Sequence, residues 1–130
     1  MKACHDRGLK VVIATSGQEK DLDWMLPAIG VEDGIVDGAS ISSDVENAKP
    51  APELMEAAME KSGLDPERPV AIGDTVWDVQ AAKRAGIRCI AVTCGGIGEA
   101  ALREEGATEV WKDPADLLAH LDESILSSLA

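Results

Sequence analysis

Apolar runs that suit buried strands alternate with helical patterns along this chain. The first run, Leu9–Thr15, is rich in β-branched residues and lies between Gly8 and Gly17, as expected of a strand covered on both faces. Two similar runs and two weaker ones follow it. The predicted strands are Leu9–Thr15, a short edge strand within Gly34–Ile41, Pro69–Gly73, Arg88–Thr93 and Glu109–Trp111.

Helical periodicity fills the segments between these strands. Gly86 and Gly106 fall just past two of the helical patterns, where a left-handed residue ends a helix. Alternation of strand and helix predicts a parallel sheet with helices on both faces, in which ligands bind at the carboxyl ends of the strands. The predicted helices are Glu19–Ile29, Pro52–Ser62, Thr75–Ala85, Glu99–Glu105 and Pro114–Leu129.

The length and composition of the chain indicate one globular domain over residues 1–130. The net charge of −12, from 12 basic and 24 acidic residues, argues against a nucleic acid partner, because affinity for nucleic acid depends on basic side chains. No segment has the length of a membrane span, and Cys4, Cys89 and Cys94 form no close pair of the metal-binding or redox type. We therefore expect a soluble, cytoplasmic protein with no membrane partner.

The segment after the strand Pro69–Gly73 holds the clearest candidate chemistry. Asp74 ends this strand, and Asp78 follows four residues later, which is one turn of a helix that begins near Thr75. Two carboxylates facing one point repel each other unless a cation neutralises them, and hard oxygen ligands suit Mg²⁺. Asp74 and Asp78 are therefore candidate metal ligands. The alternative is an ordinary helix cap with a solvated acid behind it.

Two further segments are candidates for phosphate binding. Thr15, Ser16 and Gly17 follow the first strand and offer a hydroxyl and backbone N–H groups at a strand-to-helix turn. Lys49 precedes Pro50, which holds the chain extended and lets the lysine aim its charge inward. Each pattern alone is weak, because serine and threonine commonly cap helices and a single lysine is usually solvated.

Taken in order, Thr15, Lys49–Pro50 and Gly73–Asp74–Thr75 with Asp78 resemble the haloacid dehalogenase (HAD) superfamily of phosphohydrolases, and more closely its phosphoglycolate phosphatase-like members. The resemblance implies a three-layer Rossmann-like core and a Mg²⁺-dependent phosphomonoester hydrolase that acts on a small phosphorylated metabolite. It implies that Thr15 hydrogen-bonds the phosphoryl group, that Lys49 steadies the charge on nucleophile and phosphate, and that Asp74 binds Mg²⁺, with Asp78 beside it as a ligand or behind it.

The first motif of this family has no counterpart in the chain. In the family, an apolar strand ends in Asp-x-Asp, whose first aspartate attacks phosphorus and whose second is the general acid and base. Asp21–Leu22–Asp23 has these letters but lies within a helical pattern, so we assign it no catalytic role. The chain begins where the family has the helix before its second strand. We therefore expect a truncated core that lacks its first central strand, its nucleophile motif and its cap.

The loss of that strand has a structural consequence. In the family fold it lies between the strands that end at Thr15 and at Asp74, so its absence leaves two apolar edges unpaired. We expect these edges to pair with each other, with a second copy in a homodimer, or with a complementing N-terminal segment. We also expect the isolated chain to be inactive. The alternatives are a non-catalytic Mg²⁺- or phosphate-binding module and a truncated remnant.

Two other patterns compete with this interpretation. Gly96–Ala101 fits a dinucleotide-binding fingerprint, with Asp113 downstream, but only one weak strand follows it, and we expect this loop to border the site instead. Response-regulator receivers share the fold class, yet their acidic residues come first and their lysine last. Neither pattern displaces the phosphatase prediction.

Overall fold

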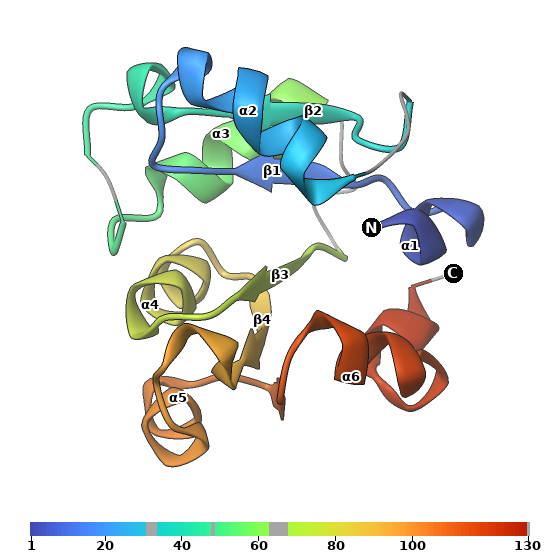
Figure 1. Ribbon diagram of the computed structural model, residues 1–130. Helices are drawn as coiled ribbons and strands as arrows, with labels where there is room; N and C mark the ends of the chain where they lie inside the picture. Colours follow the sequence, from blue (N-terminus) through green and yellow to red (C-terminus); the bar gives the residue numbers. More distant parts are fainter. Residues whose placement is uncertain (31–33, 48, 63–67, 130) are drawn as a thin grey trace.

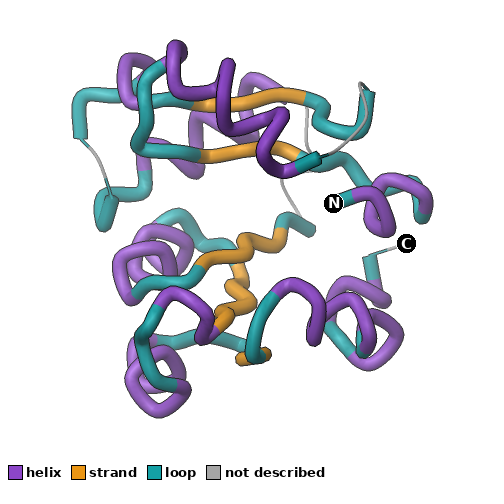
Figure 2. The backbone as a smooth tube through the Cα atoms, viewed as in Figure 1, coloured by secondary structure: helices purple, strands orange, loops and turns teal. Residues whose placement is uncertain are grey.

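The structure is a computed structural model that describes residues 1–30, 34–47, 49–62 and 68–129. Its strands form two separate parallel sheets (Figures 1 and 2). One sheet pairs β1 with β2, and the other has the order β3-β4-β5. The strands are β1 (Val12–Ala14), β2 (Gly38–Ser40), β3 (Val70–Gly73), β4 (Arg88–Val92) and β5 (Glu109–Trp111).

The helices follow the predicted alternation closely. Helices α2 and α5 have the predicted bounds, and α1 lies where the family resemblance places a helix before the first strand of this chain. Gly86 and Gly106 adopt positive φ angles of 76° and 116° just past α4 and α5, as predicted. The helices are α1 (Lys2–Asp6), α2 (Glu19–Ile29), α3 (Glu53–Ser62), α4 (Val76–Arg84), α5 (Glu99–Glu105) and α6 (Pro114–Ala119).

The predicted last helix is wrong in its length. It ends at Ala119 and gives way to two short 3-10 turns, Leu121–Glu123 and Ile125–Ser128. Ser124 separates them: its hydroxyl donates to the carbonyl oxygen of Leu121 and accepts from the N–H of Leu126. Such local side-chain hydrogen bonds compete with the helical pattern of the backbone.

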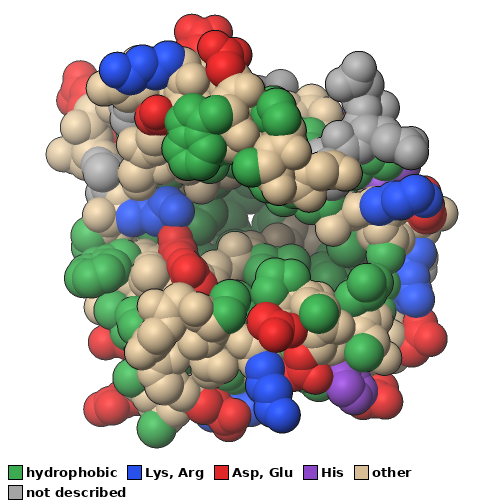
Figure 3. All heavy atoms as spheres, in the orientation of Figure 1, with side chains coloured by type: hydrophobic (Ala, Val, Ile, Leu, Met, Phe, Trp, Pro, Cys, Tyr) green, Lys and Arg blue, Asp and Glu red, His purple; other side chains and the backbone are tan. Residues whose placement is uncertain are grey.

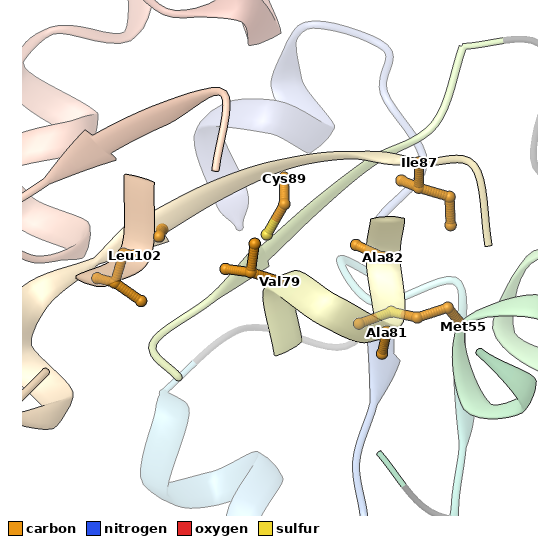
Figure 4. Packing of buried hydrophobic residues seen from close by; sticks show 8 residues of the cluster. Met55, Val79, Ala81, Ala82, Ile87, Cys89 and Leu102 are labelled. Atoms are coloured by element: carbon orange, nitrogen blue, oxygen red, sulfur yellow. The ribbon is translucent and has the colours of Figure 1, made fainter. Parts of the chain in front are cut away.

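Helices cover both sheets on both faces (Figure 1). The face of the β3-β4-β5 sheet under α4 and α5 holds one core cluster, which includes Cys89 and Ala91 and is shown in Figure 4. Ile90, between them in the sequence, packs on the other face against Leu117 of α6 and the 3-10 turns behind it. This alternation is the period of two that a strand dictates. In the described residues no helix is long and apolar enough to cross a bilayer.

Strands β1 and β3 face each other across a gap without forming a ladder (Figure 2). Of the three pairings expected for these two edges, pairing with each other is therefore wrong, and the other two stay predictions. Each half is fixed by its own helices, and α3 packs on β1 and β2 while also contacting α4. Strand β1 is also shorter than predicted, because within the described residues only the three residues of β2 pair with it.

Candidate functional site

Asp78 is the centre of a compact hydrogen-bond network at the start of α4. Its Oδ2 accepts from the backbone N–H groups of Asp74 and Thr75, each at 3.2 Å, and from the Thr75 hydroxyl at 3.0 Å. The N–H of Asp78 in turn donates to Thr75 Oγ1 at 3.2 Å. Thr75 and Asp78 therefore form a reciprocal cap that satisfies the free N–H groups of the helix terminus.

The other oxygen of Asp78 binds Lys49. The Lys49 Nζ lies 2.7 Å from Asp78 Oδ1, and the two side chains are only 18% and 11% exposed. Lys49 precedes Pro50 through a cis peptide bond, in the turn that leads to α3. The low exposure of both side chains shows that the lysine points inward, and its ammonium joins this turn to α4.

The environment of Asp78 favours its charged form. Burial alone would raise the pKa of this carboxyl, but the hydrogen bond and charge of Lys49, the Thr75 hydroxyl and the Asp74 N–H together hold the pKa below its usual value. Asp78 is thus a buried, ionised acid rather than the solvated acid of the helix-cap alternative. The helix cap of that alternative is also present, with Thr75 at the N-cap position of α4.

Two glycines allow the carboxylates to lie where they do. A Cβ atom on Gly73 would be 2.4 Å from the Cβ of Asp78, and one on Gly95 would be 2.5 Å from Oδ2 of Asp74. Both distances are far below any ordinary contact, so a side chain at either position would force the neighbouring aspartate to move. The loop after β4 therefore borders Asp74, as predicted for the segment around the Gly96 fingerprint.

Thr15, Ser16 and Gly17 lie at the end of β1, in the other half of the molecule. The N–H of Thr15 donates to the Ser40 carbonyl oxygen at 3.1 Å, which continues the β1-β2 ladder. The N–H of Gly17 donates to Thr15 Oγ1, also at 3.1 Å. Thr15 directly follows Ala14, which lines one cavity with Lys49 and Asp78. Strands β1 and β3 run in the same direction (Figure 1), so Thr15 and Asp74, which follow them, lie on the same side of the gap.

The residues present fit a magnesium site of the kind that uses few protein ligands. Both oxygens of Asp78 are engaged, whereas the carboxylate of Asp74, packed over Gly95, accepts no hydrogen bond from the described residues. Mg²⁺ is commonly held by one or two carboxylates together with water and substrate phosphate oxygens. No group of three or more metal-binding side chains occurs in the described part of the chain. Asp74 is therefore the available ligand, with Asp78 behind it.

Asp21 has a structural role, in agreement with the sequence analysis. Its Oδ2 accepts from the N–H of Gln18 at 2.8 Å, at the start of α2. That hydrogen bond is the main reason why its pKa lies below the usual value. Asp21–Leu22–Asp23 lies inside a helix and not at the end of a strand.

The sequence analysis placed Thr75 at the helix start but missed its hydrogen bonds to Asp78, and it missed Gly95. The spacing of Thr75 and Asp78 is that of a capping box, which was a readable signal for the reciprocal cap. The approach of Gly95 to Asp74 brings two strand ends together and has no signature in the local sequence.

The profile of the haloacid dehalogenase-like hydrolases matches residues 1–86. The chain belongs to this family. It is 36% identical over 110 residues to Protein SUPPRESSOR OF QUENCHING 1, chloroplastic, of Arabidopsis thaliana, covering 85% of this chain and 10% of that protein. It is 38% identical over 76 residues to Phosphoglycolate phosphatase 1 of Pseudomonas aeruginosa, covering 58% of this chain and 28% of that protein.

A solved structure agrees with the fold. The crystal structure of a hydrolase from Pseudomonas syringae superposes with a TM-score of 0.84 at 34% identity, covering 94% of this chain and 56% of that one. This HAD-like chain therefore spans about half the length of that relative, and it holds part of the HAD domain.

The buried ion pair should contribute strongly to stability. We expect Lys49→Met to lower the free energy of unfolding by about 3 kcal/mol, because it leaves the Asp78 carboxylate buried without its cation. Lys2→Met, which breaks the exposed Lys2–Asp6 pair, is the matched control and should change little. Urea denaturation followed by circular dichroism measures both. Equal effects of the two substitutions would contradict a stabilising role for the buried pair.

The same pair should make stability depend on pH. Because the pKa of Asp78 is lower in the folded than in the unfolded chain, its contribution is fully present above about pH 4 and is lost as pH falls through the folded pKa. The difference in unfolding free energy between the natural chain and Asp78→Asn should therefore shrink from about pH 6 to about pH 3. A difference that stays constant over this range would show that the Asp78 charge contributes nothing.

The close approach of Gly95 to Asp74 should make Gly95 intolerant of a side chain. We expect Gly95→Ala to lower the free energy of unfolding by about 1–3 kcal/mol, because Asp74 must move to admit the new methyl group. Gly98 lies in the same loop, where an added Cβ atom would meet nothing within 4 Å, and serine suits its N-cap site, so Gly98→Ser is the control. Thermal denaturation of both variants measures the difference in stability. A Gly95→Ala variant as stable as the natural chain would refute the close packing of Gly95 against Asp74.

Proposed function

We propose that this chain supplies part of the active site of a Mg²⁺-dependent phosphomonoester hydrolase that acts on a small phosphorylated metabolite in the cytoplasm. One observation carries the proposal: Lys49, itself nearly buried, is fixed at 2.7 Å from Asp78, which packs against Gly73 at the end of β3. Transfer of a phosphoryl group requires positive charge near its oxygens, and a nearly buried cation at the carboxyl ends of parallel strands can supply it. The similarity to Phosphoglycolate phosphatase 1 of Pseudomonas aeruginosa supports the same chemistry.

Each residue has a role that its contacts allow. The ammonium of Lys49 has three N–H groups, of which Asp78 takes one, so it can also bind a phosphoryl oxygen. The hydroxyl of Thr15 accepts from Gly17 and can donate its own proton to the same group, with Ser16 and Gly17 beside it. Asp74 would hold Mg²⁺ with Asp78 behind it, and the bound ion would neutralise charge on the phosphoryl oxygens.

The attacking carboxylate comes from outside this chain in our proposal. A carboxylate oxygen bonds to phosphorus while the bond from phosphorus to the substrate oxygen breaks, and a general acid protonates the departing alcohol. Water then attacks the phosphoenzyme, which releases inorganic phosphate and restores the carboxylate. The chain contains one Asp-x-Asp sequence, Asp21–Asp23, and it lies within α2. The isolated chain would therefore bind phosphate without turning it over.

A complementing N-terminal segment is the partner that would complete this site, with a second copy of the chain as the alternative. The absence of a strand ending in Asp-x-Asp also favours a second candidate function, a non-catalytic module that binds Mg²⁺ and phosphate, or a truncated remnant of the enzyme. The following experiment separates these functions.

We expect the purified chain to bind Mg²⁺ in the presence of inorganic phosphate but to release no phosphate from a panel of small phosphomonoesters. Asp74→Asn should weaken Mg²⁺ binding at least about tenfold in isothermal titration calorimetry, since it removes the available carboxylate. Asp23→Asn, on the exposed side of α2, is the control and should leave binding unchanged.

Two results would contradict this proposal. Equal Mg²⁺ affinity in the natural chain and Asp74→Asn would remove Asp74 from the metal site. Phosphate release by the natural chain, lost in Asp74→Asn and retained in Asp23→Asn, would show that the attacking carboxylate is already present in the purified chain.

A further inference from the structure

The turn that carries Lys49 is held by two side chains outside the candidate site. Lys49 lies between β2 and α3 and belongs to neither, so no helix or strand fixes its backbone. Its ammonium reaches Asp78 at the edge of the cavity between the two sheets, which Figure 3 shows as a hollow in the middle of the molecule. Because lysine has a flexible four-carbon stem, its ammonium keeps one place only where the backbone is also fixed.

Glu53, in the first turn of α3, binds the residues that precede Lys49. Its Oε2 accepts from the backbone N–H groups of Glu46 at 3.2 Å and Asn47 at 3.1 Å, and its Oε1 accepts from Asn47 Nδ2 at 2.6 Å. These hydrogen bonds, that of the Asn47 side chain first, hold the pKa of Glu53 below its usual value. One ionised carboxylate therefore ties the segment before Lys49 to the start of α3.

Arg84, in the last turn of α4, binds the residue that follows Lys49. Its guanidinium donates to the carbonyl oxygen of Pro50 at 3.0 Å. The same helix holds the ammonium of Lys49 through Asp78, in its first turn. The rise from Asp78 to Arg84 is about 9 Å along a helix. Helix α4 therefore holds the lysine at both ends, by its neighbouring backbone and by its ammonium.

We propose that Glu53 and Arg84 are positioning residues for Lys49. They fix the turn on both sides of the lysine, so that its ammonium keeps one N–H on Asp78 and directs the other two toward a phosphoryl group. The phosphoryl contact rests on the proposed function, whereas the placing of the ammonium on Asp78 does not. Such support matters because a displacement of about 1 Å at a reacting site can cost about a hundredfold in rate.

The alternative is that both residues only stabilise the ends of their helices. Glu53 is acidic in the first turn of α3 and Arg84 is basic in the last turn of α4, and both charges oppose the helix dipole. The chain offers a matched control for each, because Glu56 shares the first turn of α3 and Lys83 shares the last turn of α4. Replacing Glu56 or Lys83 removes a comparable charge and leaves the hydrogen bonds of the turn in place.

The first measurement needs no ligand. An amine-reactive reagent modifies the lysines of the full 130-residue chain, and mass spectrometry of the digested protein gives the rate at each lysine. The Lys49 side chain is only 18% exposed and is ion-paired, so it should react slowly. Lys20, which is exposed on α2, is the internal reference.

We expect Glu53→Ala and Arg84→Met each to raise the rate at Lys49 at least about threefold, because a loosened turn opens the ion pair more often. Glu56→Ala and Lys83→Met should leave this rate unchanged. Arg84 is exposed, so Arg84→Met keeps the test available if Glu53→Ala does not fold.

The second measurement is isothermal titration calorimetry with inorganic phosphate in the presence of Mg²⁺. Glu53→Ala and Arg84→Met should each weaken phosphate binding about tenfold, and the affinity for Mg²⁺ titrated alone should stay within about twofold, since Asp74 is untouched. Glu53→Gln should restore most of the phosphate affinity. Its amide oxygen can accept both backbone N–H groups, and the Asn47 side chain can turn over to pair with its amide nitrogen.

Several results would overturn the proposal. Unchanged labelling of Lys49 in both Glu53→Ala and Arg84→Met would mean that Asp78 alone holds the lysine. Equal effects of the two matched control variants would reduce both residues to helix stabilisers. A loss of Mg²⁺ affinity as large as the loss of phosphate affinity would mean a general disturbance of the site. A natural chain that binds no phosphate, with Lys49 labelling as expected, would support the positioning role and count against the proposed hydrolase.

Discussion

The ion pair between Lys49 and Asp78 is the interaction on which the arrangement of this molecule depends. It joins the turn that precedes α3, which packs on the β1-β2 sheet, to the first turn of α4, which covers the other sheet. A hydrogen bond of 3.0 Å from Arg84 to the carbonyl oxygen of Pro50 reinforces the same connection. Because β1 and β3 do not pair, side-chain contacts of this kind replace the backbone ladder that would otherwise hold the two halves together.

The same carboxylate serves the fold and the site. One oxygen of Asp78 holds the cation, and the other holds the backbone of Asp74 and Thr75, so the strand end, the helix start and the lysine are fixed relative to one another. Gly73 makes this possible, since any side chain there would occupy the space of Asp78. Asp74 is then left with a carboxylate that the described protein groups do not use. A rigid supporting residue beside an available ligand is the usual design of a binding site.

Much of this organisation could be predicted from the sequence. Helices α2 and α5 and strand β5 have the predicted bounds, because their periodicity agrees with their flanking residues. The length of β1 could not be predicted, because a strand extends only as far as its neighbour pairs with it. The end of α6 depends on hydrogen bonds of Ser124 that compete with the helix. Asp74 lies at the predicted strand end and Asp78 in the first turn of the predicted helix, but the orientation of the Asp78 side chain depends on its contacts with Thr75 and Lys49.

The ion pair between Lys49 and Asp78 also determines the net charge of the site. Their opposite charges largely cancel, which leaves the carboxylate of Asp74 as the uncompensated charge in a chain whose net charge is already −12. A phosphate approaching alone would meet a negative potential, whereas one approaching with a divalent cation would not. Under the proposed function, anion and cation would therefore each raise the affinity of the site for the other. This reciprocal coupling would follow from how the acidic residues are paired rather than from any movement of the chain.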